Sequence, residues 1–117
     1  MFNLNEYELV EDRLREFWKE NPDGRIETQV LEYRGDSVVI IARIFRTEVD
    51  SHAWATGIAQ ECKADLGRMS KSFVEICETS AIGRALANAN YAAKGKRPSR
   101  AEMLKVAATP AEPRRAD

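Results

Sequence analysis

The chain has 117 residues, a formal net charge of −1 and 32% charged residues, which suits one globular domain with a single modest core. No apolar run approaches the ~18 residues of a membrane span, and the N-terminus is too acidic for a secretion signal. The sequence holds two cysteines, no CxxC pattern and one histidine, so we expect neither a disulfide framework nor a zinc site. A cytosolic, reducing location fits this composition.

The charges are distributed unevenly along the chain. Residues 1–62 carry 7 Lys/Arg and 13 Asp/Glu, whereas residues 63–100 carry 8 Lys/Arg and 3 Asp/Glu. This polarity indicates either an anionic partner for the basic part or a contact between the acidic face of one subunit and the basic face of the next. From charge alone, scatter over a solvated surface explains the counts equally well.

A first helix is predicted from about residue 5 to residue 20. Its apolar side chains recur at three- and four-residue spacing, with charged residues between them: Tyr7, Val10, Leu14, Phe17 and Trp18. Asn5 is a suitable N-cap. The sequence Asn-Pro-Asp-Gly at 21–24 ends the helix and makes a turn.

Three strands are predicted next. Residues 25–33 alternate in polarity, and a turn at 34–36 leads into residues 37–46, whose β-branched side chains indicate a central strand covered on at least one side. The third strand spans residues 53–62. Gly57 inside it predicts a bulge, a bend or a close backbone approach.

A polar, basic loop is predicted at residues 63–71, and a long helix follows to about residue 92. Ser72 is its expected N-cap, with Glu75 in the position that a capping box requires. Beyond it we expect a basic linker and a short helix over 94–108 and a disordered tail over 109–117.

The predicted fold class is therefore α+β in one domain, residues 1–93. An N-terminal helix, a three-stranded antiparallel β-meander and a long C-terminal helix packed on the sheet form a β-β-β-α core with the helices on one face.

The sequence does not assemble a catalytic or metal-binding constellation. His52 is the single histidine and falls in a polar turn, so a His-based triad has no second member. No Gly-rich phosphate loop is present. Cys77 lies among apolar neighbours, which is typical of core packing rather than of a nucleophile. We therefore expect no enzymatic activity, no cofactor and no metal.

The centre of the long helix is built from small residues. Ala81, Ala85 and Ala89 form a stripe that would let the helix lie close to a sheet, and Gly83 indicates that a neighbouring backbone or a ligand excludes a bulky side chain. Arg84 is the single cation of this stretch, so its guanidinium would stand in an open concavity suited to a phosphate. An ion pair with Glu78 or with a strand carboxylate is the other interpretation.

Three segments resemble small proteins encoded by phages and prophages of actinobacteria: REFWKENPDGRIET at 15–28, WATGIAQE at 54–61 and EICETSAIGRALANANYA at 75–92. The resemblance covers about residues 5–93. That group resembles single-strand annealing proteins, namely the phage essential-recombination-function proteins and the ring-forming eukaryotic recombination mediator. The resemblance implies a β-β-β-α core, oligomers, the cytoplasm of a bacterial host, and single-stranded DNA held along a basic groove that includes Arg84.

Cations and aromatic residues near the long helix are the candidate DNA contacts, because Lys and Arg bind phosphates and aromatic rings stack on unpaired bases. Arg43 and Arg46 point to opposite faces of the central strand, so one of them could line the groove of Arg84. Trp54 and Tyr91 are candidate stacking residues, and Trp54 would equally suit a core or a subunit interface. The basic run at 94–97 is equally typical of a solvated linker. The candidate site residues are Arg84, Arg43, Arg46, Lys63, Arg68, Lys71, Trp54, Lys94, Lys96 and Arg97.

The favoured hypothesis is a non-enzymatic, single-stranded DNA-binding and strand-annealing protein of phage recombination or replication, with no membrane role. We expect a ring or filament, because a three-stranded sheet leaves two edges for pairing between subunits, and we expect a host or phage recombination protein as a further partner. The alternatives are a plain single-stranded DNA-binding protein, a regulatory protein-interaction module and, least supported, a small hydrolytic enzyme.

Overall fold

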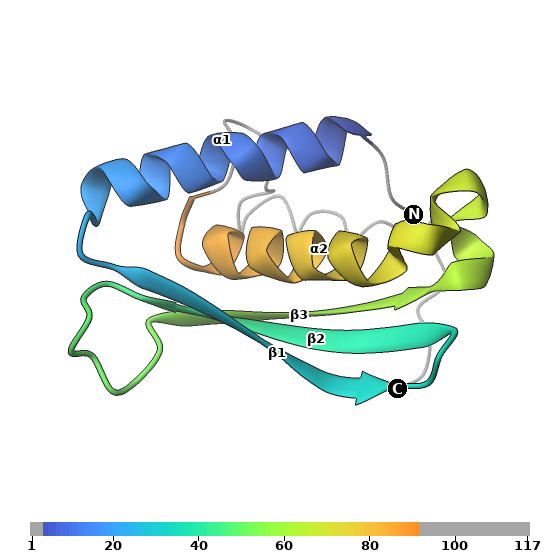
Figure 1. Cartoon of the computed structure of the whole chain (residues 1–117). Coiled ribbons are helices and arrows are strands. Elements are labelled where there is room, and N and C mark those ends of the chain that lie inside the picture. The colour runs from blue at the N-terminus through green and yellow to red at the C-terminus, as the bar shows by residue number, and fades with distance from the viewer. Residues whose placement is uncertain (1–3, 92–117) are drawn as a thin grey trace, which may run out of the picture.

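The computed structural model describes residues 4–91, and it confirms the predicted α+β class (Figure 1). Helix α1 (Leu4–Glu20) precedes three strands, β1 (Arg25–Tyr33), β2 (Ser37–Phe45) and β3 (Ala55–Cys62). Two short 3-10 helices, η1 (Lys63–Asp65) and η2 (Gly67–Ser72), then lead into helix α2 (Phe73–Asn88).

The three strands form an antiparallel meander in the order β1-β2-β3, so β2 is central as predicted. Strand β2 alternates from Ser37 to Ile44, and its four inward side chains are buried: Val38, Ile40, Ala42 and Ile44. The pairing of β1 with β2 is regular from Arg25 to Val30 and shifts by one residue between Val30 and Glu32, which makes Leu31 a bulge.

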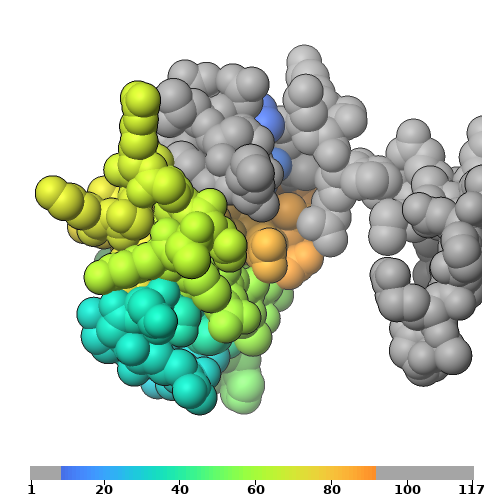
Figure 2. Space-filling model, turned by 90° about the vertical axis from the view of Figure 1, so that its right-hand side faces the viewer, coloured from blue at the N-terminus to red at the C-terminus, as the bar shows by residue number. Residues whose placement is uncertain are grey.

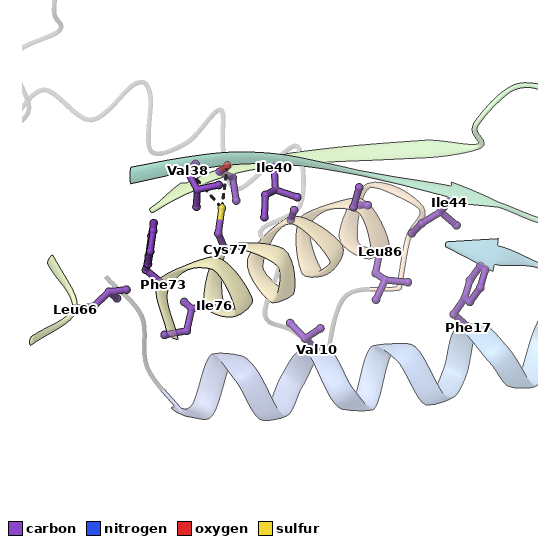
Figure 3. Close-up of a cluster of buried hydrophobic side chains, with 14 residues drawn as sticks. Val10, Phe17, Val38, Ile40, Ile44, Leu66, Phe73, Ile76, Cys77 and Leu86 are labelled. Atoms are coloured by element: carbon purple, nitrogen blue, oxygen red, sulfur yellow. Dashed lines mark hydrogen bonds between the residues drawn. The ribbon is translucent and has the colours of Figure 1, made fainter. Parts of the chain in front are cut away.

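Helix α2 lies against the inner face of the sheet, and α1 lies over α2 on the side away from the sheet (Figure 1). The core fills the space between these layers, and Cys77 lies inside it (Figure 3). The Cys77 thiol donates to the carbonyl oxygens of Ala59 and Val38 at 3.3 and 3.6 Å. Cys77 is fully buried in the core cluster, so its predicted packing role is confirmed, and this burial raises the pKa of the thiol.

Two glycines mark the closest contacts of α2. A Cβ on Gly57 would lie 2.3 Å from the backbone nitrogen of Ala85 and 2.6 Å from the carbonyl oxygen of Ala81, so the expected close backbone approach is present and α2 rests directly on β3. A Cβ on Gly83 would lie 2.6 Å from Cγ2 of Val10. The group that leaves no room for a side chain at Gly83 is thus the Val10 side chain of α1, and not a neighbouring backbone.

The helix ends differ from the predictions. Helix α1 begins at Leu4, so Asn5 lies inside it and is not its N-cap. Residues 63–71 are not an irregular loop: the segment forms η1 and η2, and Leu66 between them is buried. Ser72 does occupy the N-cap position of α2, but its side chain makes no capping hydrogen bond, because η2 delivers the chain with φ −105° and ψ 24° instead of an extended conformation.

Helix α2 ends at Asn88, four residues before the predicted end. Asn90 has a φ of 75°, in the left-handed region that asparagine tolerates. The backbone N–H of Asn90 donates to Ala87 at 3.0 Å and that of Tyr91 to Leu86 at 2.7 Å, the pattern of a Schellman motif. The reversal returns the Tyr91 ring to the core. The predicted linker, short helix and tail lie outside the described residues.

Candidate nucleic-acid interface

A shallow groove of about 450 Å³ runs between α2 and the free edge of β3. We call it the β3 groove, and its lining residues are Thr56, Gly57, Ile58, Arg84 and Asn88. Because Gly57 has no side chain, α2 comes close enough for its outer face to overhang the strand. The Arg84 guanidinium donates to the carbonyl oxygen of Ile58 at 3.0 Å, and the Asn88 amide donates to that of Thr56 at 2.7 Å.

Arg84 is exposed in this groove, as the concavity interpretation predicted. The alternative of an ion pair with Glu78 is wrong for the described residues, because Glu78 instead accepts a hydrogen bond from the Thr28 hydroxyl at 2.7 Å, on the β1 side of α2. One N–H of Arg84 contacts Ile58, and a guanidinium carries five. The remaining donors can reach an anion without breaking an ion pair.

A second recess of about 550 Å³ adjoins the end of α2. We call it the aromatic pocket, and its lining includes Arg46, Trp54 and Tyr91. The Arg46 guanidinium carbon lies 3.9 Å from the centre of the Trp54 ring, and the Tyr91 ring meets Trp54 edge-on with centroids 5.9 Å apart. Trp54 is half-buried, packed on the core with one part facing this pocket.

Tyr91 is held in place by polar groups from the end of α1. Its hydroxyl donates to the Glu20 carboxylate at 2.7 Å and accepts from the Asn21 amide at 3.0 Å. Burial, followed by the hydrogen bond to Glu20, raises the pKa of Tyr91, so the phenol stays neutral at physiological pH. Since Glu16 and Glu20 also line this pocket, it suits an uncharged ring better than a phosphate.

A third feature is the basic end of the domain, which consists of the exposed residues Lys63, Arg68 and Lys71 on η1 and η2. The backbone N–H of Lys63 donates to the carbonyl oxygen of Asp36 at 2.8 Å, which connects η1 to the turn between β1 and β2. Figure 2 views the molecule from this end, with the cyan turn beneath the yellow-green η1 and η2, whose long side chains project into solvent.

Strand β3 connects these three features. Trp54 precedes it, Thr56 and Ile58 lie in its first half, and Lys63 follows its last residue. The strand has eight residues, so the aromatic pocket and the basic end are about 26 Å apart along it. The β3 groove lies between them.

Some of the predicted site residues do not lie in these three features along β3. Arg43 lies on the outer face of the sheet, where it donates to the Gln29 side chain at 2.9 Å. Arg46 follows the last residue of β2, so it is not on the central strand as predicted, and it lines the aromatic pocket. Lys94, Lys96 and Arg97 lie outside the described residues. His52 is exposed in its turn, as expected.

Asn88 and the Glu20–Asn21 pair contribute to the site and were missed in the sequence. Asn88 follows Arg84 by four positions, so the helical period alone places both on one face of α2. Glu20 and Asn21 are about 70 residues away from Tyr91, and no local pattern could link them.

Within residues 4–91, no three Asp, Glu, His or Cys side chains gather as a metal site would require. In the same range, no helix combines the length and apolar character needed to cross a bilayer.

A family model described as Slr1353 N-terminal dsRNA-binding domain-like matches residues 14–89 of the chain, from α1 to the end of α2. That description names a nucleic-acid-binding domain, so the match supports nucleic-acid binding in general. Neither the curated proteins nor the solved structures gave a match.

Proposed function

The chain belongs to the Slr1353 N-terminal dsRNA-binding domain-like family, and from that premise we propose that it is a non-enzymatic nucleic-acid-binding protein. As its main ligand we propose single-stranded DNA. One observation carries the choice of a single strand: the cationic β3 groove opens beside an aromatic pocket. In a duplex, neighbouring bases cover the ring faces. Aromatic stacking beside a cationic groove is therefore the arrangement that suits unpaired bases.

Each feature has a distinct part in this proposal. Arg84 contacts a phosphate through the N–H groups that Ile58 leaves unused. The aromatic pocket takes a base on the Arg46 guanidinium, which itself lies over the Trp54 ring, while Glu16 and Glu20 disfavour a phosphate there. The basic end adds phosphate contacts that carry no sequence information.

Strand annealing in phage recombination is the finer part of the proposal, and the resemblance to phage annealing proteins supports it. A protein that holds the backbone of one strand and stacks only some of its bases leaves the other base edges accessible to a complementary strand. No catalytic group is needed for that step.

Double-stranded RNA is the second candidate ligand, because the family description names it and because the basic end offers a separate cationic surface. Lys63, Arg68 and Lys71 are all exposed on one short segment. Such a surface could follow the phosphates of a duplex without the aromatic pocket.

Fluorescence anisotropy with labelled single-stranded DNA, duplex DNA and duplex RNA, at two salt concentrations, tests the proposal. We expect the tightest binding to single-stranded DNA, with a clear loss of affinity at the higher salt. Arg84→Ala should weaken this binding by ~1–3 kcal/mol, the cost of a lost charge-assisted contact. Arg15→Ala removes an exposed cation from α1 and serves as the matched control, with affinity unchanged.

Two results would decide against a single-stranded ligand. Equal affinity for all three nucleic acids without salt dependence would remove the proposed interface altogether. Tighter binding to duplex RNA that resists Arg84→Ala and is weakened by Arg68→Ala would transfer the function to the basic end.

A further inference from the structure

The two edges of the sheet differ in a way that bears on self-association. On β3, the Thr56 and Ile58 carbonyl oxygens point away from β2 and are occupied by the side chains of Asn88 and Arg84. An edge strand whose acceptors are already used is a poor template for another strand. Strand β1 has no comparable cover: among the side chains of residues 9–91, none on a helix donates to the outward backbone groups of β1, and α2 meets β1 through the Thr28 hydroxyl, which donates to Glu78.

Strand pairing fixes which backbone groups of β1 are free. The backbone groups of Thr56 and Ile58 point away from β2. Those of the residues opposite them on β2, Arg43 and Ile41, must therefore form their hydrogen bonds with β1. Their β1 partners, Glu27 and Gln29, therefore use their backbone groups internally. The intervening residues, Ile26, Thr28 and Val30, direct their N–H and C=O groups outward.

The same strand exposes apolar side chains. Val30 is 51% exposed although it points to the inner face, because α2 covers β2 and β3 and hardly reaches β1. Figure 1 shows β1 at the near edge of the sheet, with α2 above β2 and β3. The bulge at Leu31 ends the regular backbone, so a partner strand can pair with residues 26–30 only.

We propose that two copies of the chain pair through β1 in an antiparallel, two-fold arrangement centred on Thr28. This register sets Thr28 opposite its own copy and Ile26 opposite Val30 of the second copy, so all three outward residues exchange backbone hydrogen bonds. Glu27 then faces Gln29 across the interface. The two sheets become one continuous sheet, and apolar side chains meet on its inner face.

Other registers of the same strand are worse. A slip by two residues in one direction leaves Val30 unpaired and sets Glu27 opposite its own copy, which is a like-charge pair. A slip in the other direction runs into the bulge at Leu31. A head-to-tail chain of subunits would need the β3 edge, whose Thr56 and Ile58 carbonyls are occupied. Strand pairing therefore favours a closed dimer over the ring or filament expected from the sequence.

The dimer is independent of nucleic-acid binding, so its test uses the full chain alone. Light scattering at tens of micromolar should give a mass of about twice 13.2 kDa. Val30→Lys places a charge opposite Ile26 of the second copy and should yield a monomer. Val49→Lys is the matched control, since Val49 is 89% exposed in the loop after β2, and it should stay dimeric.

Cross-linking tests the register. In a Cys62→Ser background, Thr28→Cys brings two thiols together at the two-fold axis, where opposite Cα atoms are ~5.5 Å apart, within the range of a disulfide. Mild oxidation should give a cross-linked dimer with Thr28→Cys and none with Thr56→Cys on the opposite edge. The monomeric Val30→Lys should abolish the cross-link.

A wild-type monomer at this concentration would overturn the proposal, including the case in which another part of the same chain covers β1. Larger assemblies, or cross-linking through Thr56→Cys as efficient as through Thr28→Cys, would also overturn it.

Discussion

Replacing Gly57 by alanine should strongly destabilise the fold. The added methyl group would lie 2.3 Å from the Ala85 nitrogen and 2.6 Å from the Ala81 carbonyl oxygen, and both atoms belong to the backbone of α2. Favourable contacts of a carbon atom begin near ~3.5 Å. The helix must therefore retreat from β3 by about 1 Å, which no change of a side-chain rotamer can avoid.

The loss of stability on Gly57→Ala depends on which atoms must move to make room for the methyl group. Overpacking costs ~1–3 kcal/mol in a core that can adjust, and here the obstacle is main chain, so the upper part of that range applies. Lower entropy of the unfolded chain returns ~0.4–1 kcal/mol on replacing a glycine. We expect a net loss of ~2–3 kcal/mol in the free energy of unfolding, or about 10 °C or more in Tm for a domain of this size.

Urea unfolding followed by circular dichroism measures this loss, with Gly83→Ala as the matched control. There the added methyl meets a side chain and no backbone, Cγ2 of the buried Val10 at 2.6 Å, so α1 must shift slightly while α2 keeps its place on the sheet. Because alanine also gains ~1 kcal/mol of helix propensity over glycine, Gly83→Ala should cost clearly less stability than Gly57→Ala. A Gly57→Ala protein with the wild-type urea midpoint would show that α2 does not depend on this close approach.

Three further predictions concern single side chains. Arg84→Lys should keep part of the affinity for single-stranded DNA in the anisotropy assay and change Tm little, since an exposed cation contributes little to stability; a large drop in Tm would make Arg84 a structural residue. A thiol reagent should modify Cys62 in the native protein and Cys77 only after unfolding, because burial raises the pKa of the Cys77 thiol; two equally fast thiols would contradict this. The raised pKa of Tyr91 means that the folded state holds its proton more tightly than the unfolded state, so this stabilisation is complete below about pH 10 and is lost as pH rises further; Tyr91→Phe should flatten the difference in stability between pH 8 and pH 11, and an unchanged difference would contradict it.

Local patterns in the sequence predicted most of the fold. Alternating polarity and β-branched residues located β1 within its observed bounds and identified β2 as the central strand. The alanine stripe and Gly57 both indicated close packing of α2, because small residues on a helix face and in a strand allow two backbones to approach each other. The prediction failed where tertiary contacts decide: Ala89 would continue the helix, but Asn90 takes the left-handed conformation and Tyr91 turns back to reach Phe17 and Trp54.

The candidate site was only partly visible in the sequence. Arg84 could be identified because it is an isolated cation on a face of small residues. The link between Arg46 and Trp54 depends on how the loop between β2 and β3 returns, which no periodicity encodes. The occupation of the Thr56 and Ile58 carbonyls was equally hidden, since it requires both the strand register and the rotational setting of α2.

That rotational setting has a consequence for how α2 is held. In its centre, the face that α2 presents to the sheet consists of Cβ methyl groups, Ala81 and Ala85 among them. Such short side chains do not interlock with the sheet, so they do little to prevent α2 from rotating about its axis or shifting along it. Hydrogen bonds on both sides of α2 prevent these movements: Glu78 is bonded to Thr28 on β1, and Arg84 and Asn88 are bonded to β3. The polar side chains thus fix the rotation of α2 about its own axis, while the apolar contacts fix its distance from the sheet.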